Sequence, residues 1–266
     1  MEEKTLKRWE DFEQIASEML EERNLRERIR HGPIFRGQSN SNWKLASTLE
    51  RNTADLSIDK YLGTIKSVSK EVASCTGKSW DIDDIKPDNL IQEGLPNIKA
   101  FEYIAYLRHN GFPSPLLDWT LSPYVAAYFA FSKWHNDINP EMKVSIYSYT
   151  VESLNKYGFI CSTEPYIIPI GHTIQTDRKH YLQQSEYTIC LRKERNSIDR
   201  IEFCRYEDVK PENYSADLVK YNIPASVGVK VLRKLASMNI TAYSLFETEA
   251  ALMETLSLRE FFLSDG

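Results

Sequence analysis

The chain has 266 residues, enough to bury a substantial core as one large domain or as one domain with a small helical prefix. Hydrophobic residues make up 42% and charged residues 27%, which is ordinary for a soluble globular protein, and no apolar run approaches the roughly 18 residues of a membrane helix. A net charge of −5 gives no general basic footprint for nucleic acid, and the charged N-terminus is unlike a signal peptide, so we expect a cytoplasmic protein without a membrane partner.

Residue spacing indicates no metal site. The four cysteines form no Cys-x-x-Cys pair, so neither a zinc site nor a disulfide framework is predicted. His172 and His180 are eight residues apart and lack a matching carboxylate motif. Gly-x-Ser-x-Gly and a Walker loop are also missing, which removes the usual support for serine hydrolase and P-loop chemistry.

The first segment of the chain is predicted to be helical. Apolar residues recur at helical spacing over residues 6–29, which indicates one or two amphipathic helices ending near Gly32. The arginine-rich end of this segment is typical of a solvated helix face. We therefore expect residues 1–32 to pack as a helical segment on a main domain formed by residues 33–266.

The next stretch, PIFRGQSNSNWKLASTL at residues 33–49, places Arg36 at the end of a short predicted strand. Gly37 would let the backbone leave that strand, and residues 39–42 are turn formers. The planar guanidinium suits a phosphate or carboxylate ligand, although an arginine bonded to carbonyls at a strand end fits equally well.

Two further helices are expected before the middle of the chain. The first covers residues 61–73, and the second covers residues 98–107 and stops at Asn110-Gly111. Between them, Asp81, Asp83 and Asp84 lie in an acidic piece that we interpret as a solvated turn.

Residues 113–134 predict a strand, a short polar turn and a helix. Two prolines force an extended entry, and Ser122-Pro123 gives an N-cap followed by a first-turn proline. Asp118 and Thr120 lie at the strand-to-helix turn, where loop-borne functional groups are often held. Alternatively, Asp118 and Ser122 only satisfy backbone donors at the helix start.

The second half of the chain is dominated by predicted strands. They cover residues 143–150, 166–170, 187–191, 201–206 and 218–223, and are followed by a helix at 224–238, a strand at 240–245 and a final helix. The predicted fold class is therefore α+β, a mixed or antiparallel sheet core flanked by helices, with an N-terminal helical part.

Two motifs resemble the signatures of the FRG domain family. Phe35-Arg36-Gly37-Gln38, with Trp43, Leu45 and Arg51 beyond it, is similar to the opening signature. Leu116 to Thr120 running into Ala126 to Ala130 is similar to the second. Residues 235–246 give a looser third match. The resemblance implies an FRG domain over residues 33–266 and a role in bacterial conflict systems.

The FRG resemblance extends distantly to ADP-ribosyltransferases. Their signature is an Arg, then Ser-Thr-Ser, then Gln/Glu-x-Glu along the chain. The order of Arg36, Thr120 with Ser122, and Gln184-x-Glu186 is similar to it. It implies NAD as the substrate, since a carboxylate can stabilise the oxocarbenium-like ribose formed when nicotinamide leaves. Glu186 is the expected carboxylate, with Glu247 or Glu249 as alternatives. Arg36 would clamp the pyrophosphate or the ribose side, and Thr120 would position Glu186 and the ribose. Gln184 would orient the nucleophile. The dinucleotide site would consist of Phe35, Arg36, Gly37, Gln38, Asp118, Trp119, Thr120 and Ser122.

The resemblance thus implies an NAD-dependent transferase that acts as a toxin or phage-defence effector on a protein or nucleic acid acceptor, with a neutralising antitoxin as a further partner. Basic segments interleaved with tyrosines, at residues 178–181 and 192–195, leave RNA or single-stranded DNA open as the acceptor. The alternative is a non-catalytic module that binds a nucleotide, a nucleic acid or a partner protein through Arg36 and the turn at residues 118–120.

Overall fold

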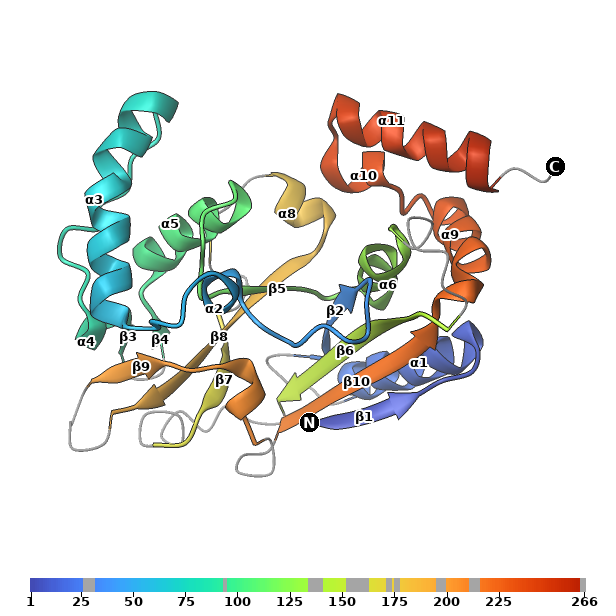
Figure 1. Cartoon of the computed structure of the whole chain (residues 1–266), viewed down its shortest axis with the longest axis horizontal. Coiled ribbons are helices and arrows are strands. Elements are labelled where there is room, and N and C mark those ends of the chain that lie inside the picture. The colour runs from blue at the N-terminus through green and yellow to red at the C-terminus, as the bar shows by residue number, and fades with distance from the viewer. Residues whose placement is uncertain are drawn as a thin grey trace.

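The computed structural model of the chain describes residues 1–25, 32–92, 95–133, 141–151, 163–170, 174, 178–194, 200–210 and 216–263. Within these residues the fold is α+β, with helices packed against one eight-stranded mixed sheet (Figure 1). The predicted α+β class and the mixed character of the sheet are confirmed.

The sheet combines strands from both ends of the chain. In spatial order they are β1 (Glu2–Thr5), β10 (Ala216–Pro224), β6 (Lys143–Val151), β2 (Ile34–Gln38), β5 (Leu117–Thr120), β8 (Ser185–Lys193) and β7 (Tyr166–Pro169), with β9 (Ile201–Phe203) also pairing with β8. The β1–β10 pair is parallel, and the other pairs among the described strands are antiparallel. The short strands β3 (Ile91–Gln92) and β4 (Leu95–Pro96) form a separate ribbon.

The helices cover the sheet in two groups (Figure 1). Helices α3 (Ile58–Thr76) and α5 (Ile98–His109) form a core with β7 and β8, while α1 (Trp9–Leu25), α6 (Pro123–Phe131) and α9 (Gly228–Ser237) form a second core with β6 and β10. The other helical segments are α2 (Thr48–Asn52), α4 (Pro87–Leu90), η2 (Tyr206–Asp208), α8 (Arg178–Leu182), η4 (Ala225–Val227), α10 (Ala242–Phe246), α11 (Glu249–Leu258) and η5 (Arg259–Leu263). Among the described residues, no helix combines the length and apolar character needed to cross a membrane.

The sheet narrows to a single residue pair between β2 and β5. Phe35 pairs with Thr120 there, whereas β2 and β6 pair over five positions and β5 and β8 over four. Beyond this pair the two strands diverge, so the two halves of the sheet open away from each other. The site described below lies at this opening.

Gly37 lies inside β2, because the strand continues through Gln38 rather than ending at Arg36 as the sequence predicted. Its lack of a side chain serves helix packing: a Cβ at Gly37 would overlap the carbonyl oxygen of Ala126 and lie 2.6 Å from the backbone nitrogen of Ala130. Helix α6 therefore packs directly against the backbone of β2, and its start follows the predicted Ser122 N-cap, which accepts from the backbone N–H of Val125.

The N-terminal segment contributes to the main sheet and core. The predicted helix is α1, and residues 26–29 of the predicted range lie outside the described residues. The sequence did not indicate β1. Trp9 and Phe12 of α1 are buried at 1% exposure, with the Trp9 ring edge-on to Phe131 of α6. Residues 1–25 are thus built into the second core.

Three predicted elements at the C-terminal side differ from the structure. Residues 240–245, predicted as a strand, contain the start of α10, which Thr241 caps by accepting from the backbone N–H of Ser244. The helix predicted from Pro224 begins at Gly228, because β10 runs through Pro224 before the η4 turn. The strand predicted at 201–206 ends at Phe203.

Candidate functional site

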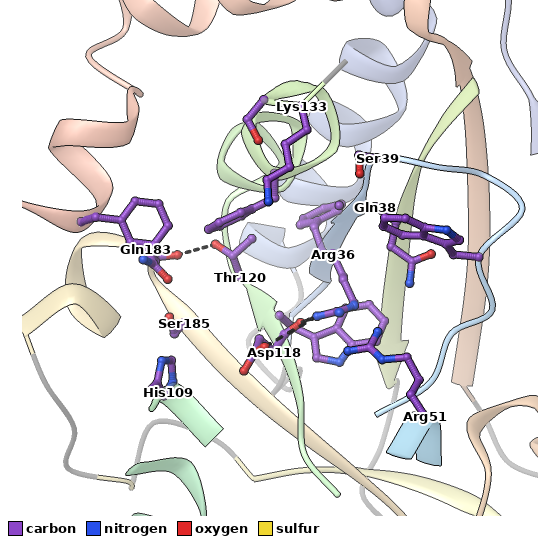
Figure 2. Close-up of a pocket in the computed structure, with 17 residues that line it drawn as sticks. Arg36, Gln38, Ser39, Arg51, His109, Asp118, Thr120, Lys133, Gln183 and Ser185 are labelled. Atoms are coloured by element: carbon purple, nitrogen blue, oxygen red, sulfur yellow. Dashed lines mark hydrogen bonds and ion pairs between the residues drawn. The ribbon is translucent and has the colours of Figure 1, made fainter. Parts of the chain in front are cut away.

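A cavity of about 400 Å³ lies at the opening between β2 and β5. Its walls come from the end of β2, from β5, from the end of α6 and from the turn that precedes β8 (Figure 2). Single side chains from α2, α5 and α10 complete the lining, so the cavity gathers segments from across the chain.

Seven of the eight residues predicted for the dinucleotide site line this cavity: Phe35, Arg36, Gly37, Gln38, Asp118, Trp119 and Thr120. Ser122 does not line it and acts as the N-cap of α6. The fold thus brings residues 35–38 and residues 118–120 together, as a shared site requires.

The two residues predicted at the start of β8 do not line the cavity. Gln184 precedes the strand in a left-handed turn (φ 48°) and is exposed, so it does not share a strand face with Glu186. Glu186 is 3% exposed, while its neighbour Ser185 and its cross-strand partner Trp119 both line the cavity. Gln183 and Ser185 are the residues of this segment that reach the cavity wall.

Asp118 holds two arginines at the cavity wall. Arg108 Nη2 donates to Asp118 Oδ2 at 2.6 Å, and Arg36 Nη1 donates to the Asp118 backbone oxygen at 2.6 Å while lying 3.9 Å from Oδ2. The contact between Arg36 and the Asp118 carbonyl spans the place where the backbones of β2 and β5 have separated. The guanidinium thereby ties the two halves of the sheet together.

Burial and opposite charge oppose each other in this group. Burial lowers the pKa of Arg36, and the nearby Asp118 carboxylate acts against that decrease. Burial pushes the pKa of Asp118 upward, but the charges of Arg108, Arg36 and His109 outweigh it and keep that pKa below its ordinary value. Asp118 is therefore an ionised anchor at neutral pH.

The charged side chains that line the cavity are mainly cationic. Arg36, Arg51 and Lys133 line it together with His109, and Asp118 is the sole carboxylate among the described lining residues. Burial lowers the pKa of Arg51, and the positive charge of Arg108 lowers it further. Figure 2 shows Lys133 and Arg51 at opposite ends of the cavity. An anionic ligand would therefore meet positive charge along its length.

Thr120 joins β5 to the segment before β8. Its hydroxyl donates to the backbone oxygen of Gln183 at 2.7 Å (Figure 2) and accepts from the backbone N–H of Ser122 at 3.1 Å. Gln183 in turn donates from Nε2 to the backbone oxygen of Leu245 at 3.1 Å. These bonds fix Gln183 and α10 against the cavity.

The residues of the two sequence blocks thus meet in one site, with Arg36 of the first bound to Asp118 of the second. The model of the FRG domain family matches residues 32–138. The chain contains an FRG domain. The matched range includes both blocks and excludes the looser third one at residues 235–246. No curated protein and no solved structure shows a significant match to the chain.

Aromatic side chains also line this cavity, called the FRG cavity below because most of its lining residues lie within 32–138. Trp43, in the loop between β2 and α2, is 54% exposed, and Phe129 of α6 packs edge-on against Phe246 of α10 with ring centroids 6.0 Å apart. Such flat apolar faces can stack against a planar ring system.

Several residues of the FRG cavity were not predicted as site residues. Trp43, Arg51 and Phe129 lie in the stretches that resemble the two FRG signatures, and Phe246 ends the looser third match, but none of them was predicted to line a site. Lys133 carries no motif. The alternative acid Glu247 bonds Arg178 at 3.0 Å next to Phe246, and Glu249 lies in the first turn of α11. His172, Cys161 and Arg195 lie outside the described residues, and no group of three potential metal ligands occurs within those described.

Proposed function

We propose that the FRG cavity binds the phosphate groups of a nucleotide, with NAD as the ligand that the sequence resemblance names. The lining carries this proposal: three cationic side chains face one carboxylate, and that carboxylate is already engaged by Arg108. Guanidinium groups bind phosphate through paired charge-assisted hydrogen bonds. A cavity of about 400 Å³ falls within the range of small-molecule sites.

Unpaired polar atoms give independent support for a ligand site. Five buried side-chain atoms of the described residues have no hydrogen-bond partner. Three belong to residues that line the cavity, Arg36 Nε, Gln38 Oε1 and Asp118 Oδ1, and a fourth, Arg108 Nε, belongs to the arginine bound to Asp118. Native proteins leave few such atoms, and those that occur mark strained or functional places.

Calorimetric titration with ADP, NAD and adenosine tests the proposal. ADP and NAD should bind at least about tenfold more tightly than adenosine, since each charged hydrogen bond contributes about 1.5–3 kcal/mol. Arg51→Ala should remove most of that difference because Arg51 is the exposed guanidinium of the site.

Arg192→Ala is the matched control. Arg192 is also exposed, lies at the far end of β8 and pairs with Glu202 at 2.8 Å, so its loss should leave nucleotide affinity unchanged. Equal affinity for adenosine and ADP in the wild type, or equal losses in both variants, would contradict a phosphate site.

ADP-ribosyl transfer is the second candidate function, favoured by the meeting of Arg36 and Thr120 in one cavity beside Ser185. The reaction also requires a carboxylate near the ribose. Burial raises the pKa of Glu186 to about 7, and this residue adjoins two lining residues. Glu247, beside the lining residue Phe246, is the other acid to test.

Nicotinamide release from NAD separates transfer from binding. A transferase predicts release by the wild type and its loss in Arg36→Gln and in either Glu186→Gln or Glu247→Gln. Tight binding of NAD without release, in the presence of protein and RNA from a cell lysate, would leave the binding module as the function.

The cellular role implied by the FRG resemblance is that of a toxin or phage-defence effector with a neutralising partner. Induced expression should then arrest growth in cells that lack the partner, and Arg36→Gln should relieve the arrest. Growth that does not respond to the wild-type protein, with or without phage challenge, would argue against this role.

A further inference from the structure

A phenol hydroxyl contacts two packed imidazoles at the wall of the FRG cavity. Tyr187 Oη is hydrogen-bonded to His109 Nε2, and it also contacts His180 Nδ1 at 2.6 Å. The two imidazole rings are tilted by 47° with centroids 3.8 Å apart. The three side chains come from α5, β8 and α8, so the fold has assembled a continuous chain of exchangeable protons.

The chain of hydrogen bonds runs from the cavity into the interior. His109 lines the cavity beneath Ser185 (Figure 2), whereas Tyr187 is 2% and His180 is 7% exposed. His109 is also the last residue of α5, where the helix dipole favours a positive charge. A proton received at the cavity wall can therefore move to a shielded position.

We propose that His109, Tyr187 and His180 form a proton relay, and that His109 takes the proton from the acceptor in ADP-ribosyl transfer. This role rests on the second candidate function. His109 would be a catalytic residue, while Tyr187 and His180 would act through it.

The proton balance of the step is complete. The acceptor oxygen forms its bond to the ribose carbon as the bond to nicotinamide breaks, and nicotinamide leaves with the bonding electron pair. His109 binds the acceptor proton and passes its Nε2 proton to Tyr187 Oη, and the phenolic proton moves to His180 Nδ1. The positive charge ends on His180.

Two imidazoles this close should share one proton. A second positive charge 3.8 Å away is unfavourable, so the pair should titrate in two separated steps. Among the charged groups, the Asp118 carboxylate of β5 interacts electrostatically with His109 and is paired with Arg108 of α5. Arg178, which pairs with Glu247, lies two residues before His180 on α8. A hydrogen bond to a charged imidazole stabilises the charged form. Tyr187 should therefore raise the pH at which the histidine pair takes up its first proton, which is called the first step below.

Nuclear magnetic resonance of histidine-labelled full-length protein tests the relay without requiring turnover. The wild type should show two steps at least about one pH unit apart, with both imidazole signals responding to each. Tyr187→Phe should move the first step to lower pH by about half a unit or more. Independent titration of the histidines, or an unchanged first step in Tyr187→Phe, would overturn the relay.

Tyr103→Phe is the matched control, since it removes a buried hydroxyl of α5 that bonds the Ile65 backbone oxygen at 3.2 Å. The same variants are then compared for ADP affinity and nicotinamide release. Tyr187→Phe should keep ADP affinity and lose about 10²-fold or more in release, a typical acid–base contribution. If Tyr187→Phe released nicotinamide as fast as the wild type does, the catalytic role would be overturned. Absence of release from the wild type would refute transfer and this catalytic role, while the titration would still decide whether the relay exists.

Discussion

Asp118 determines how the cationic wall of the cavity is held. Its carboxylate pairs directly with Arg108 and lies within ion-pair distance of Arg36. The side chains of both arginines are 14% exposed. A guanidinium at such burial needs a partner, because an unpaired charge away from water is costly. With two arginines fixed in this way, the exposed Arg51 is the group most able to reach a ligand.

Glu186 should make stability depend on pH. Its folded pKa of about 7 lies above the ordinary value of 4.5, so the stabilising effect of its protonated form is complete below pH 4.5 and is lost as pH rises through 7. The loss amounts to about 3 kcal/mol in the free energy of unfolding. Glu186→Gln should therefore match the wild type at pH 4 and exceed it at pH 8.5 in urea unfolding.

The opposite result, a Gln variant that is weaker than the wild type at pH 8.5, would show that the ionised carboxylate stabilises the fold. Arg192→Ala serves again as a control here, because its exposed ion pair contributes little to stability.

At the residue scale, sequence patterns found one side of the site. Arg36 and Asp118 were predicted because a strand end, a glycine and a turn each leave a local signature. Arg108 and Lys133 leave none, since their place beside the cavity depends on how α5 and α6 pack. Arg51 belongs to the stretch that resembles the opening FRG signature, but its place at the cavity depends on how α2 packs. The Gln-x-Glu motif predicted that Glu186 lies in the site. Side chains alternate along β8, however, and it is Ser185 that lines the cavity.

At the scale of elements, the contact between β2 and α6 shapes the cavity. The helix backbone touches the strand backbone at Gly37, and this places Phe129 and Lys133 at the cavity edge. A larger separation would move the cationic end of α6 away from Arg36. The FRG tripeptide therefore combines a charged group with the glycine that allows the helix to approach.

Gly37→Ala should push α6 away from β2. The added Cβ meets backbone atoms, which cannot rotate aside, so we expect a loss of about 3 kcal/mol or more in unfolding free energy or failure to fold. Gly63→Ala in α3 is the control: nothing lies within 4 Å of the new Cβ, and alanine favours the helix by about 1 kcal/mol. Thermal unfolding of both variants provides the measurement, and similar behaviour of the two would contradict the packing account.

Element type was predictable where length and caps agreed. The Ser122-Pro123 start identified α6, and Asn110-Gly111 identified the end of α5. The sequence predicts a strand where α10 lies, because a five-residue segment has too few positions to distinguish a helical period from a strand period. β1 is short and charged, and only its pairing with β10 makes it a strand.

At the scale of the whole molecule, residues 1–25 close one side of the fold. β1 extends the sheet at β10, and α1 buries Trp9 and Phe12 against α6 and β10. Because α6 also forms a cavity wall, the N-terminal segment supports the site from behind.

Trp9→Ala should lower the free energy of unfolding by about 3–5 kcal/mol, the usual cost of emptying a large aromatic site in a core. Trp43→Ala is the natural comparison, since Trp43 is 54% exposed at the cavity mouth and should affect nucleotide affinity more than stability. Urea unfolding and ADP titration of both variants should give opposite rankings. A stable Trp9→Ala protein would indicate that the N-terminal segment can be separated from the main domain.

A crystal structure of the protein with ADP tests the central claim most directly. We predict that the diphosphate lies in the cavity between β2 and β5, with a phosphate oxygen hydrogen-bonded to Arg51 and Asp118 still bound to Arg108. A complex in which ADP occupies another surface, or crystals grown at saturating ADP with an empty cavity, would contradict the nucleotide site.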